Sequence, residues 1–339
     1  MKIAIHHREK SFSDRWITYC EANKLDYVIV DSFDNTIIEK IQSLGITHFL
    51  WHFHHASVND ILVSNYVMNA IENIGIKTFP NKNTRWHFED KVAQKYLFES
   101  LHLPHAKSYV FYDKIDALKF VEKTTFPIVS KLKRGAGATN VKLITTKEEA
   151  KENIELMFSK GVNPGGTVLT GVDQKIRLAK KIKNPIHLAK KVYSFIIKHK
   201  REKQIANKEC GYVYFQEFMP KNDFDTRIIV IGNMTFGMRR FNRTNDFRAS
   251  GSGKIDYNCA AIDIEIVKLA QEASAKIGAQ CLAFDFVYNA EKKPVIIEVC
   301  YAFSINAYDF CEGYWDKNLT FHKVAFNPQH QMIKELLCQ

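Results

Sequence analysis

Residues 281–300 read CLAFDFVYNAEKKPVIIEVC and have the pattern of a β-hairpin. The first part is apolar and aromatic-rich, and the second is largely β-branched and begins at Pro294. The polar segment between them, residues 289–293, predicts a turn. A turn centred there places Asp285 directly opposite Glu298, with the two carboxylates on one face of the sheet.

Two carboxylates that close repel each other unless a cation lies between them. A hard divalent ion such as Mg²⁺ is bound through one or two carboxylates and keeps its other positions for water and phosphate oxygens. Asp285 and Glu298 are therefore candidate metal ligands. An edge hairpin whose acids face solvent is the simpler interpretation, and the pair alone would favour it. The remaining motifs in the chain, described below, favour the metal-binding interpretation instead.

The composition is that of a globular protein. The chain has 339 residues, 46% hydrophobic and 25% charged, which is enough for two or three domains. No apolar run approaches the roughly 20 residues needed to cross a bilayer, and the N-terminus predicts a first strand instead of a signal peptide. The seven cysteines are scattered without metal-ligand spacing, as expected for free thiols in a reducing cytosol. We expect a cytoplasmic protein with no membrane span.

The first 80 residues alternate between strand and helix patterns. Strands are expected at residues 2–6, 26–30 and 47–53, with helices around 13–23, 35–44 and 58–74. This order predicts a small βαβ unit with a parallel sheet. Histidines cluster near the expected strand ends (His6, His7, His52, His54 and His55). No third-ligand spacing supports a zinc site, so polar or substrate-facing strand ends are the favoured interpretation.

The next region contains a glycine-rich turn. After a linker at residues 80–83, a single helix is expected from about residue 84 to residue 101, and strands at 106–112, 126–132 and 141–144. The middle strand ends in Lys131, followed by Gly135 and Gly137. Glycines let backbone N–H groups turn toward an anion, so the segment could cover phosphates. It is not a Walker loop, and in isolation a glycine hairpin with an exposed lysine would be the better interpretation.

The net charge of +11 is concentrated in residues 173–208, where lysine and arginine are dense at helical spacing. An apolar face accompanies them, which predicts one or two amphipathic helices. Binding to nucleic acid or to an anionic membrane is conceivable. A solvated helix on the protein body is the favoured interpretation, and nucleic acid is not an expected partner.

From residue 212 onward the pattern is antiparallel. Strands are expected at residues 212–219, 225–231 and 234–241, a helix at 262–277 and a C-terminal helix at 329–337. Alternation along the third strand places Arg240 on the face of Met238 and Arg239 on the opposite face. An arginine on a partly apolar face needs an anion, which makes Arg240 a candidate for contact with a transferring phosphoryl group.

Several short motifs follow one another in an informative order. They are Asp90-Lys91, Pro127-x-Val129-x-Lys131 with Gly135 and Gly137, Gln216-Glu217-Phe218, Asp225-Thr226-Arg227, Arg240 with Arg248, Phe284-Asp285 and Ile297-Glu298. Together they resemble the ATP-grasp superfamily, particularly its ribosomal-protein glutamate ligase-like branch, over about residues 80–301. The resemblance implies an α/β (α+β) ATP-grasp fold. Its parts would be a Rossmann-like βαβ domain (1–83), a central flap subdomain (84–210, with the basic insert 173–208) and a larger antiparallel-sheet subdomain (211–339).

The resemblance also implies a set of site residues. ATP would be contacted by Lys91, Lys131, Gly135, Gly137, Gln216, Glu217, Phe218, Met219, Asp225 and Ser250. Arg240 and Arg248 would act in catalysis, and Asp285 and Glu298 would hold Mg²⁺. Two positions depart from the pattern: Cys300 stands where the third metal ligand is usually asparagine, and Ser250 also replaces an asparagine. A thiol is a poor ligand for a hard cation.

The implied activity is that of an ATP-dependent carboxylate–amine ligase, which activates a carboxylate as an acyl phosphate before an amine attacks. Residues 246–251 and 313–316 resemble a subgroup associated with polysaccharide and surface-glycan biosynthesis, which suggests a glycan precursor as one substrate. The alternatives are an ATP-binding protein that lost catalysis through the change at Cys300, or a nucleic-acid-binding protein. The identities of the acid and the amine, and whether the chain forms a homodimer, stay open.

Overall fold

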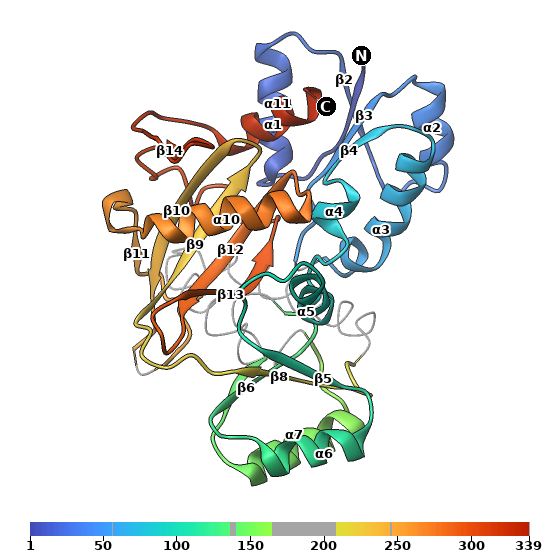
Figure 1. The fold of residues 1–339 in the computed structure, drawn as a ribbon. Coiled ribbons are helices and arrows are strands. Elements are labelled where there is room, and N and C mark those ends of the chain that lie inside the picture. The colour runs from blue at the N-terminus through green and yellow to red at the C-terminus, as the bar shows by residue number, and fades with distance from the viewer. Residues whose placement is uncertain (56, 136–139, 165–207, 245, 339) are drawn as a thin grey trace, which may run out of the picture. The chain divides into compact units, whose positions relative to one another are not determined.

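The computed structural model describes residues 1–55, 57–135, 140–164, 208–244 and 246–338 (Figure 1). The chain divides into two compact units. The first contains Met1–Ala106 and Met219–Gln339, and the second contains Lys107–Phe218. The sequence-based division at residues 83 and 210 stays a prediction. Among the described residues, no helix is both long enough and apolar enough to span a membrane.

The first unit begins with a four-stranded parallel sheet in the order β2-β1-β3-β4. Its strands are β1 (Ile3–His6), β2 (Tyr27–Val30), β3 (His48–Trp51) and β4 (Lys77–Phe79), and its helices are α1 (Phe12–Ala22), α2 (Ile37–Ser43) and α3 (Val58–Asn73). The parallel βαβ arrangement predicted from the sequence is confirmed. Strand β4 lies just before the predicted linker, where no strand was expected.

The single helix predicted over residues 84–101 is wrong. The chain forms a short helix α4 (Lys82–Arg85) and a separate helix α5 (Lys91–Ser100). Glu89 adopts a left-handed conformation with φ of 53°, which a continuous right-handed helix does not allow. Asp90 then caps α5, because its side chain accepts a hydrogen bond from the backbone N–H of Ala93. The break places Lys91 in the first turn of a new helix.

The largest sheet also belongs to the first unit and follows the order β13-β12-β9-β10-β14-β15, with β11 paired to β10. Its strands are β9 (Phe224–Ile231), β10 (Met234–Phe241), β11 (Ile255–Asp256), β12 (Cys281–Tyr288), β13 (Pro294–Cys300), β14 (Tyr314–Trp315) and β15 (Phe321–His322). Helix α10 (Ile264–Ile277) lies across one face of this sheet (Figure 1). Its buried face carries Ile266, Ala270 and Ala273, which belong to the core that also contains Phe284. Helix α11 (Pro328–Leu337) packs against α1.

The second unit is a four-stranded antiparallel sheet in the order β5-β8-β6-β7. Its elements are β5 (Ser108–Phe111), α6 (Lys114–Lys123), β6 (Ile128–Lys131), β7 (Val141–Ile144), α7 (Lys147–Phe158) and β8 (Val213–Glu217). Helices α6 and α7 lie side by side on one face of the sheet (Figure 1). The strand expected from residue 212 is therefore the second strand of this sheet, next to β5 and β6.

Candidate active site

The β12–β13 hairpin has the predicted pairing at its functional end. Asp285 is opposite Glu298, Phe284 is opposite Val299 and Ala283 is opposite Cys300. The register shifts by one residue immediately after Asp285, so Phe286 pairs with Ile296. Such a bulge is common next to functional side chains because it changes the direction in which a side chain points.

Asp285 is buried and bound by two arginines. Arg227 donates from Nε to Oδ1 and from Nη2 to Oδ2, both at 2.6 Å, and Arg240 donates from Nη2 to Oδ2 at 2.9 Å. Burial alone would raise the pKa of Asp285, but the two guanidinium groups hold it well below its usual range. The two arginines therefore favour the ionised form of Asp285.

The cluster extends across three neighbouring strands. Arg240 on β10 also donates to Asp225 on β9, with Nε–Oδ1 and Nη2–Oδ2 distances of 2.7 and 2.6 Å. The strand register places Arg240 opposite Asp225 and Arg227 opposite Asp285. Two arginines and two aspartates thus form an alternating, charge-balanced set, which we call the sheet charge cluster. Arg227 was present in a quoted motif but was not assigned to the site; its i, i+2 spacing from Asp225 was the available signal.

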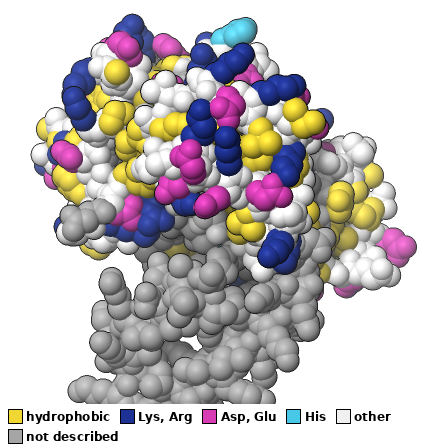
Figure 2. Space-filling model, turned by 90° about the horizontal axis from the view of Figure 1, so that it is seen from below, with side chains coloured by type: hydrophobic (Ala, Val, Ile, Leu, Met, Phe, Trp, Pro, Cys, Tyr) yellow, Lys and Arg dark blue, Asp and Glu magenta, His cyan; other side chains and the backbone are white. Residues whose placement is uncertain are grey.

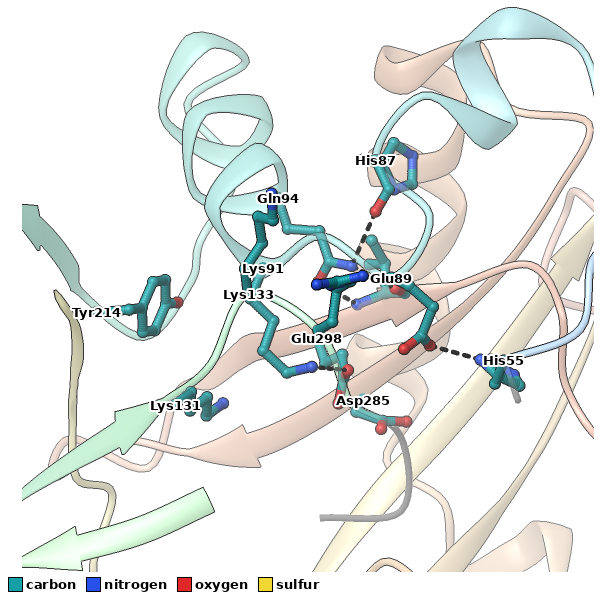
Figure 3. A network of polar contacts seen from close by, with 12 residues as sticks. His55, His87, Glu89, Lys91, Gln94, Lys131, Lys133, Tyr214, Asp285 and Glu298 are labelled. Atoms are coloured by element: carbon teal, nitrogen blue, oxygen red, sulfur yellow. Dashed lines mark hydrogen bonds and ion pairs between the residues drawn. The ribbon is translucent and has the colours of Figure 1, made fainter. Parts of the chain in front are cut away.

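Glu298 is neutralised by a different cation. Nζ of Lys91, in the first turn of α5, lies 3.1 Å from Glu298 Oε1 (Figure 3). Gln94, one turn further along α5, donates to the carbonyl of Val299 at 2.9 Å and accepts from its N–H at 3.2 Å. This double hydrogen bond fixes α5 against β13. Gln94 was not a predicted site residue, and nothing in its sequence context marked it.

The carboxylate pair has the donor chemistry that Mg²⁺ prefers. Asp285 and Glu298 supply oxygen atoms from opposed positions, and Glu298 keeps about a third of its side chain exposed. Oδ1 of Asp285 accepts one of the three hydrogen bonds from the arginines, which leaves it lone-pair capacity for a metal. These residues fit a magnesium ion. The thiol of Cys300 does not add to such a site.

In the second unit, Lys131 is buried at the end of β6 and donates from Nζ to Oε1 of Gln216 at 2.6 Å. Nε2 of Gln216 donates to Oγ of Ser108 at 3.1 Å. The side chain of Gln216 is therefore used to position Lys131. The backbone N–H of Glu217 donates to the carbonyl of Lys107 at 2.8 Å.

The chain passes between the two units at Phe218 and Met219, within the predicted adenine-binding segment. The apolar contact expected of these two residues with a nucleotide base stays a prediction.

A buried carboxylate organises the start of the glycine-rich turn. Glu209 accepts from the backbone N–H groups of Lys133 and Arg134, at 3.0 and 3.2 Å, and from Nε of Arg134 at 2.7 Å. Gly135 follows with φ of 126°, a conformation that favours glycine. Gly137 lies outside the described residues. Glu209 was not predicted, because it is remote in sequence from the turn that it holds.

The two predicted catalytic arginines have different partners. Arg248 donates to Asp246, with Nη2 2.7 Å from Oδ2, in the segment that follows β10. The same segment includes Ser250, whose backbone carbonyl accepts from Nε of Arg243 at 3.1 Å. No hydrogen bond is found between Arg248 and the carboxylates of the sheet charge cluster among the residues that the structure describes.

The predicted alternation of β10 is confirmed. Arg240 contacts Asp225, whereas Arg239 donates to Asp256, with Nε 3.1 Å from Oδ2. The guanidinium of Arg239 also lies over the rings of Phe224 and Phe241. The two consecutive arginines therefore have separate surroundings, and only Arg240 belongs to the sheet charge cluster.

Comparison with known proteins relates the chain to ATP-grasp proteins. Residues 187–310 match the RimK-like ATP-grasp domain. A curated relative, the alpha-aminoadipate–LysW ligase LysX of Saccharolobus solfataricus, is 22% identical over 282 residues, which cover 82% of this chain and 85% of the relative.

Solved structures show the same fold. A RimK domain ATP-grasp protein of Sphaerobacter thermophilus has a TM-score of 0.56 at 12% identity, and each chain is fully covered. The D-alanine–D-alanine ligase of Bacillus anthracis, solved with ATP, has a TM-score of 0.56 at 12% identity over 100% of this chain and 97% of the other. The chain thus has the ATP-grasp fold, and residues 187–310 match the RimK-like domain of that superfamily. Members of this ligase family are ATP-dependent enzymes, and ATP with Mg²⁺ is typical of them.

Proposed function

We propose that the protein is an ATP-dependent carboxylate–amine ligase that forms an amide bond through an acyl phosphate. The observation that supports this most directly is the row of charged residues across β10, β9, β12 and β13. Asp285 belongs to the sheet charge cluster and is opposite Glu298 on the next strand. Glu298 in turn contacts Lys91. Buried arginines beside an oxygen-donor metal pair suit the transfer of a phosphoryl group.

In the proposed reaction a carboxylate oxygen of the acid attacks the γ-phosphorus of ATP, and the bond to the bridging oxygen of ADP breaks. The amine nitrogen then attacks the acyl carbon, inorganic phosphate leaves, and the nitrogen loses a proton. Mg²⁺ held by Asp285 and Glu298 would neutralise charge on the outer phosphates. Arg240 would bind the transferring group, and Asp225 would hold its guanidinium in orientation.

The remaining predicted residues take nucleotide-binding roles in this proposal. Lys91 and Lys131 would contact phosphate oxygens, and the N–H groups near Gly135 would cover them. The segment from Gln216 to Met219 would bind adenine through its backbone and the apolar side chains of Phe218 and Met219. Arg248 and Ser250, in the segment after β10, would contact the acyl phosphate or its phosphoryl group.

We further propose that the substrates are a small-molecule carboxylate and an amine, and that the enzyme adds an amino acid or another amine to a glycan precursor or a small acid. Support comes from the glycan-associated motifs at residues 246–251 and 313–316 and from relatives whose names describe ligation of amino acids. Localisation in the cytoplasm and assembly as a homodimer stay predictions.

The proposal is tested by measuring ADP release from Mg·ATP with a panel of uronic acids, nucleotide-sugar acids, amino acids and peptides, each offered with a mixture of amines. Mass spectrometry of active combinations identifies the amide. A chain that binds Mg·ATP but releases no ADP across the panel would support the alternative of an ATP-binding protein altered by Cys300.

Nucleic acid binding receives no support from the described residues. The basic insert lies outside them except for Lys208. On the face drawn in Figure 2, Lys and Arg side chains are interspersed with Asp and Glu side chains. Lys147 and Lys151 on α7 both form ion pairs with Glu122 on α6. The face drawn in Figure 2 therefore does not present the continuous basic surface that polyanions require.

A further inference from the structure

Three side chains of ligating types converge beside the proposed magnesium site. A ring nitrogen of His55, a carboxylate oxygen of Glu89 and the thiol of Cys300 all lie within 4.8 Å of one another. They come from three places in the first unit: the segment after β3, the residue before the cap of α5, and the end of β13. We call them the mixed-ligand cluster. Its residue types were not recognisable as a metal motif because they are separated by 34 and 211 residues in the sequence.

Both ring nitrogens of His55 have hydrogen-bond partners, and the one toward Glu89 would be exchanged for the metal. Its Nδ1 lies 2.5 Å from Oε1 of Glu89, and its Nε2 contacts the backbone carbonyl of Ala302. Ligating histidines commonly donate the second ring N–H to a carbonyl, which fixes the tautomer and directs the other nitrogen at the metal. Figure 3 shows the His55 ring and the Glu89 carboxylate pointing toward each other.

The backbone of the cluster is also specialised. Glu89 is a non-glycine residue with φ of 53°, and its side chain is almost fully buried. Strand alternation places Cys300 on the same face of β13 as Glu298, two residues further along the strand. The thiol is therefore a neighbour of the oxygen-donor pair. His55 keeps about a third of its side chain exposed, which leaves one side of the cluster open.

We infer that His55, Glu89 and Cys300 form a second metal site, which takes a borderline divalent ion such as Zn²⁺ or Co²⁺. One imidazole, one carboxylate and one thiolate balance the charge of a divalent cation. Ligand atoms around tetrahedral zinc are roughly 3.3–3.8 Å apart, so small side-chain movements suffice to accommodate the ion. Nitrogen and sulfur donors select such ions over Mg²⁺, and three protein ligands leave a fourth position for water or substrate.

The test uses the full chain after removal of metals by a chelator, titrated with Co²⁺ in the absence of nucleotide. A thiolate-to-cobalt charge-transfer band should appear and saturate at about one equivalent. Cys300→Asn should abolish the band, while His55→Gln and Glu89→Gln should each weaken Co²⁺ affinity by at least about tenfold. Cys210→Ser, which removes an exposed thiol, is the matched control and should leave the titration unchanged.

Three results would overturn the inference: no charge-transfer band in the wild-type chain, a band that survives Cys300→Asn, or unchanged affinity in both His55→Gln and Glu89→Gln. The last result would indicate metal bound by a thiol alone. Thermal melting of each variant without metal shows whether it is folded. Asp285→Asn should retain the band under conditions in which the variant is folded, because Asp285 is not one of the three proposed ligands. The outcome is thus independent of whether the chain proves to be a ligase.

Discussion

Asp285 and Glu298 are opposed on neighbouring strands, yet each is neutralised by a cation from a different part of the fold. Asp285 is bound by Arg227 and Arg240 from the same sheet, and Glu298 is bound by Lys91 from α5. The two negative charges are therefore held close together, and each is compensated by its own cationic partners. Because these contacts already fix both carboxylates, a metal ion that binds them would lose less binding free energy to the ordering of side chains.

The carboxylate pair should be essential for turnover. Glu298→Gln should abolish ADP release while changing stability little, because Glu298 is partly exposed and its bond to Lys91 is a single contact. The measurement is coupled ADP release together with thermal melting. Glu291→Gln, in the exposed turn of the same hairpin, is the control. Turnover of Glu298→Gln within a few-fold of wild type would remove Glu298 from the proposed metal site.

Asp285→Asn should abolish turnover and also destabilise the fold. Arg240 keeps Asp225 as a partner, but the substitution leaves the charge of Arg227 uncompensated, and loss of one partner from a buried ion pair costs about 3–5 kcal/mol. Chemical denaturation measures this loss, and activity must be assayed where the variant is still folded. Equal stabilities for Asp285→Asn and Glu298→Gln would contradict the different surroundings described for the two carboxylates.

Arg240 should act in the chemical step and Arg239 should not. Arg240→Met is expected to lower kcat by about a hundredfold or more, the scale of losing one donor to a developing charge, with a smaller effect on KM for ATP. Arg239→Met removes a partly exposed pair with Asp256 and should cost no more than about 1 kcal/mol of stability. Steady-state kinetics of the two variants provide the comparison. If Arg239→Met lowered kcat strongly and Arg240→Met did not, Arg240 would no longer be assigned to the chemical step.

Lys131 should govern nucleotide affinity. Lys131→Ala removes a buried ammonium group whose position is set by Gln216, so ATP binding should weaken. Isothermal titration with Mg·ATP measures the change. Lys142→Ala, on the neighbouring strand β7 and exposed, should bind as the wild type does. Equal affinities in the two variants would make Lys131 a structural residue only.

Burial of His87 makes the fold sensitive to acid. The ring is almost fully buried, and desolvation lowers its pKa to about 4. The unfolded chain therefore binds a proton at higher pH than the folded chain does. Stability from this group is complete above the unfolded pKa of about 6.5 and falls as pH drops from there to about 4, by about 3 kcal/mol in total.

The measurement is the free energy of unfolding between pH 7 and pH 4. His87→Phe keeps an aromatic ring and removes the titration, so its loss of stability over this range should be smaller than that of the wild type. Parallel curves for the two proteins would show that His87 is not responsible.

Much of the fold could be predicted from local patterns. The alternation of β10 separated Arg239 from Arg240, and the composition of the β12–β13 hairpin gave its ends and the pairing of Asp285 with Glu298. These features depend on period-2 side-chain alternation and on turn chemistry between adjacent strands, which act over a few residues. The order of the short motifs along the chain also indicated the resemblance to the ATP-grasp superfamily.

Only the tertiary structure decided which charges meet. Arg227 contacts Asp285, 58 residues later in the sequence, Lys91 contacts Glu298, and His55 contacts Glu89 close to Cys300. The helix break at Glu89, which brings Lys91 and Glu89 to these positions, opposed the local helical pattern. Sequence patterns report which face of an element a residue occupies. The partners across that face depend on strand order and on helix packing, which are set by long-range contacts among the buried side chains.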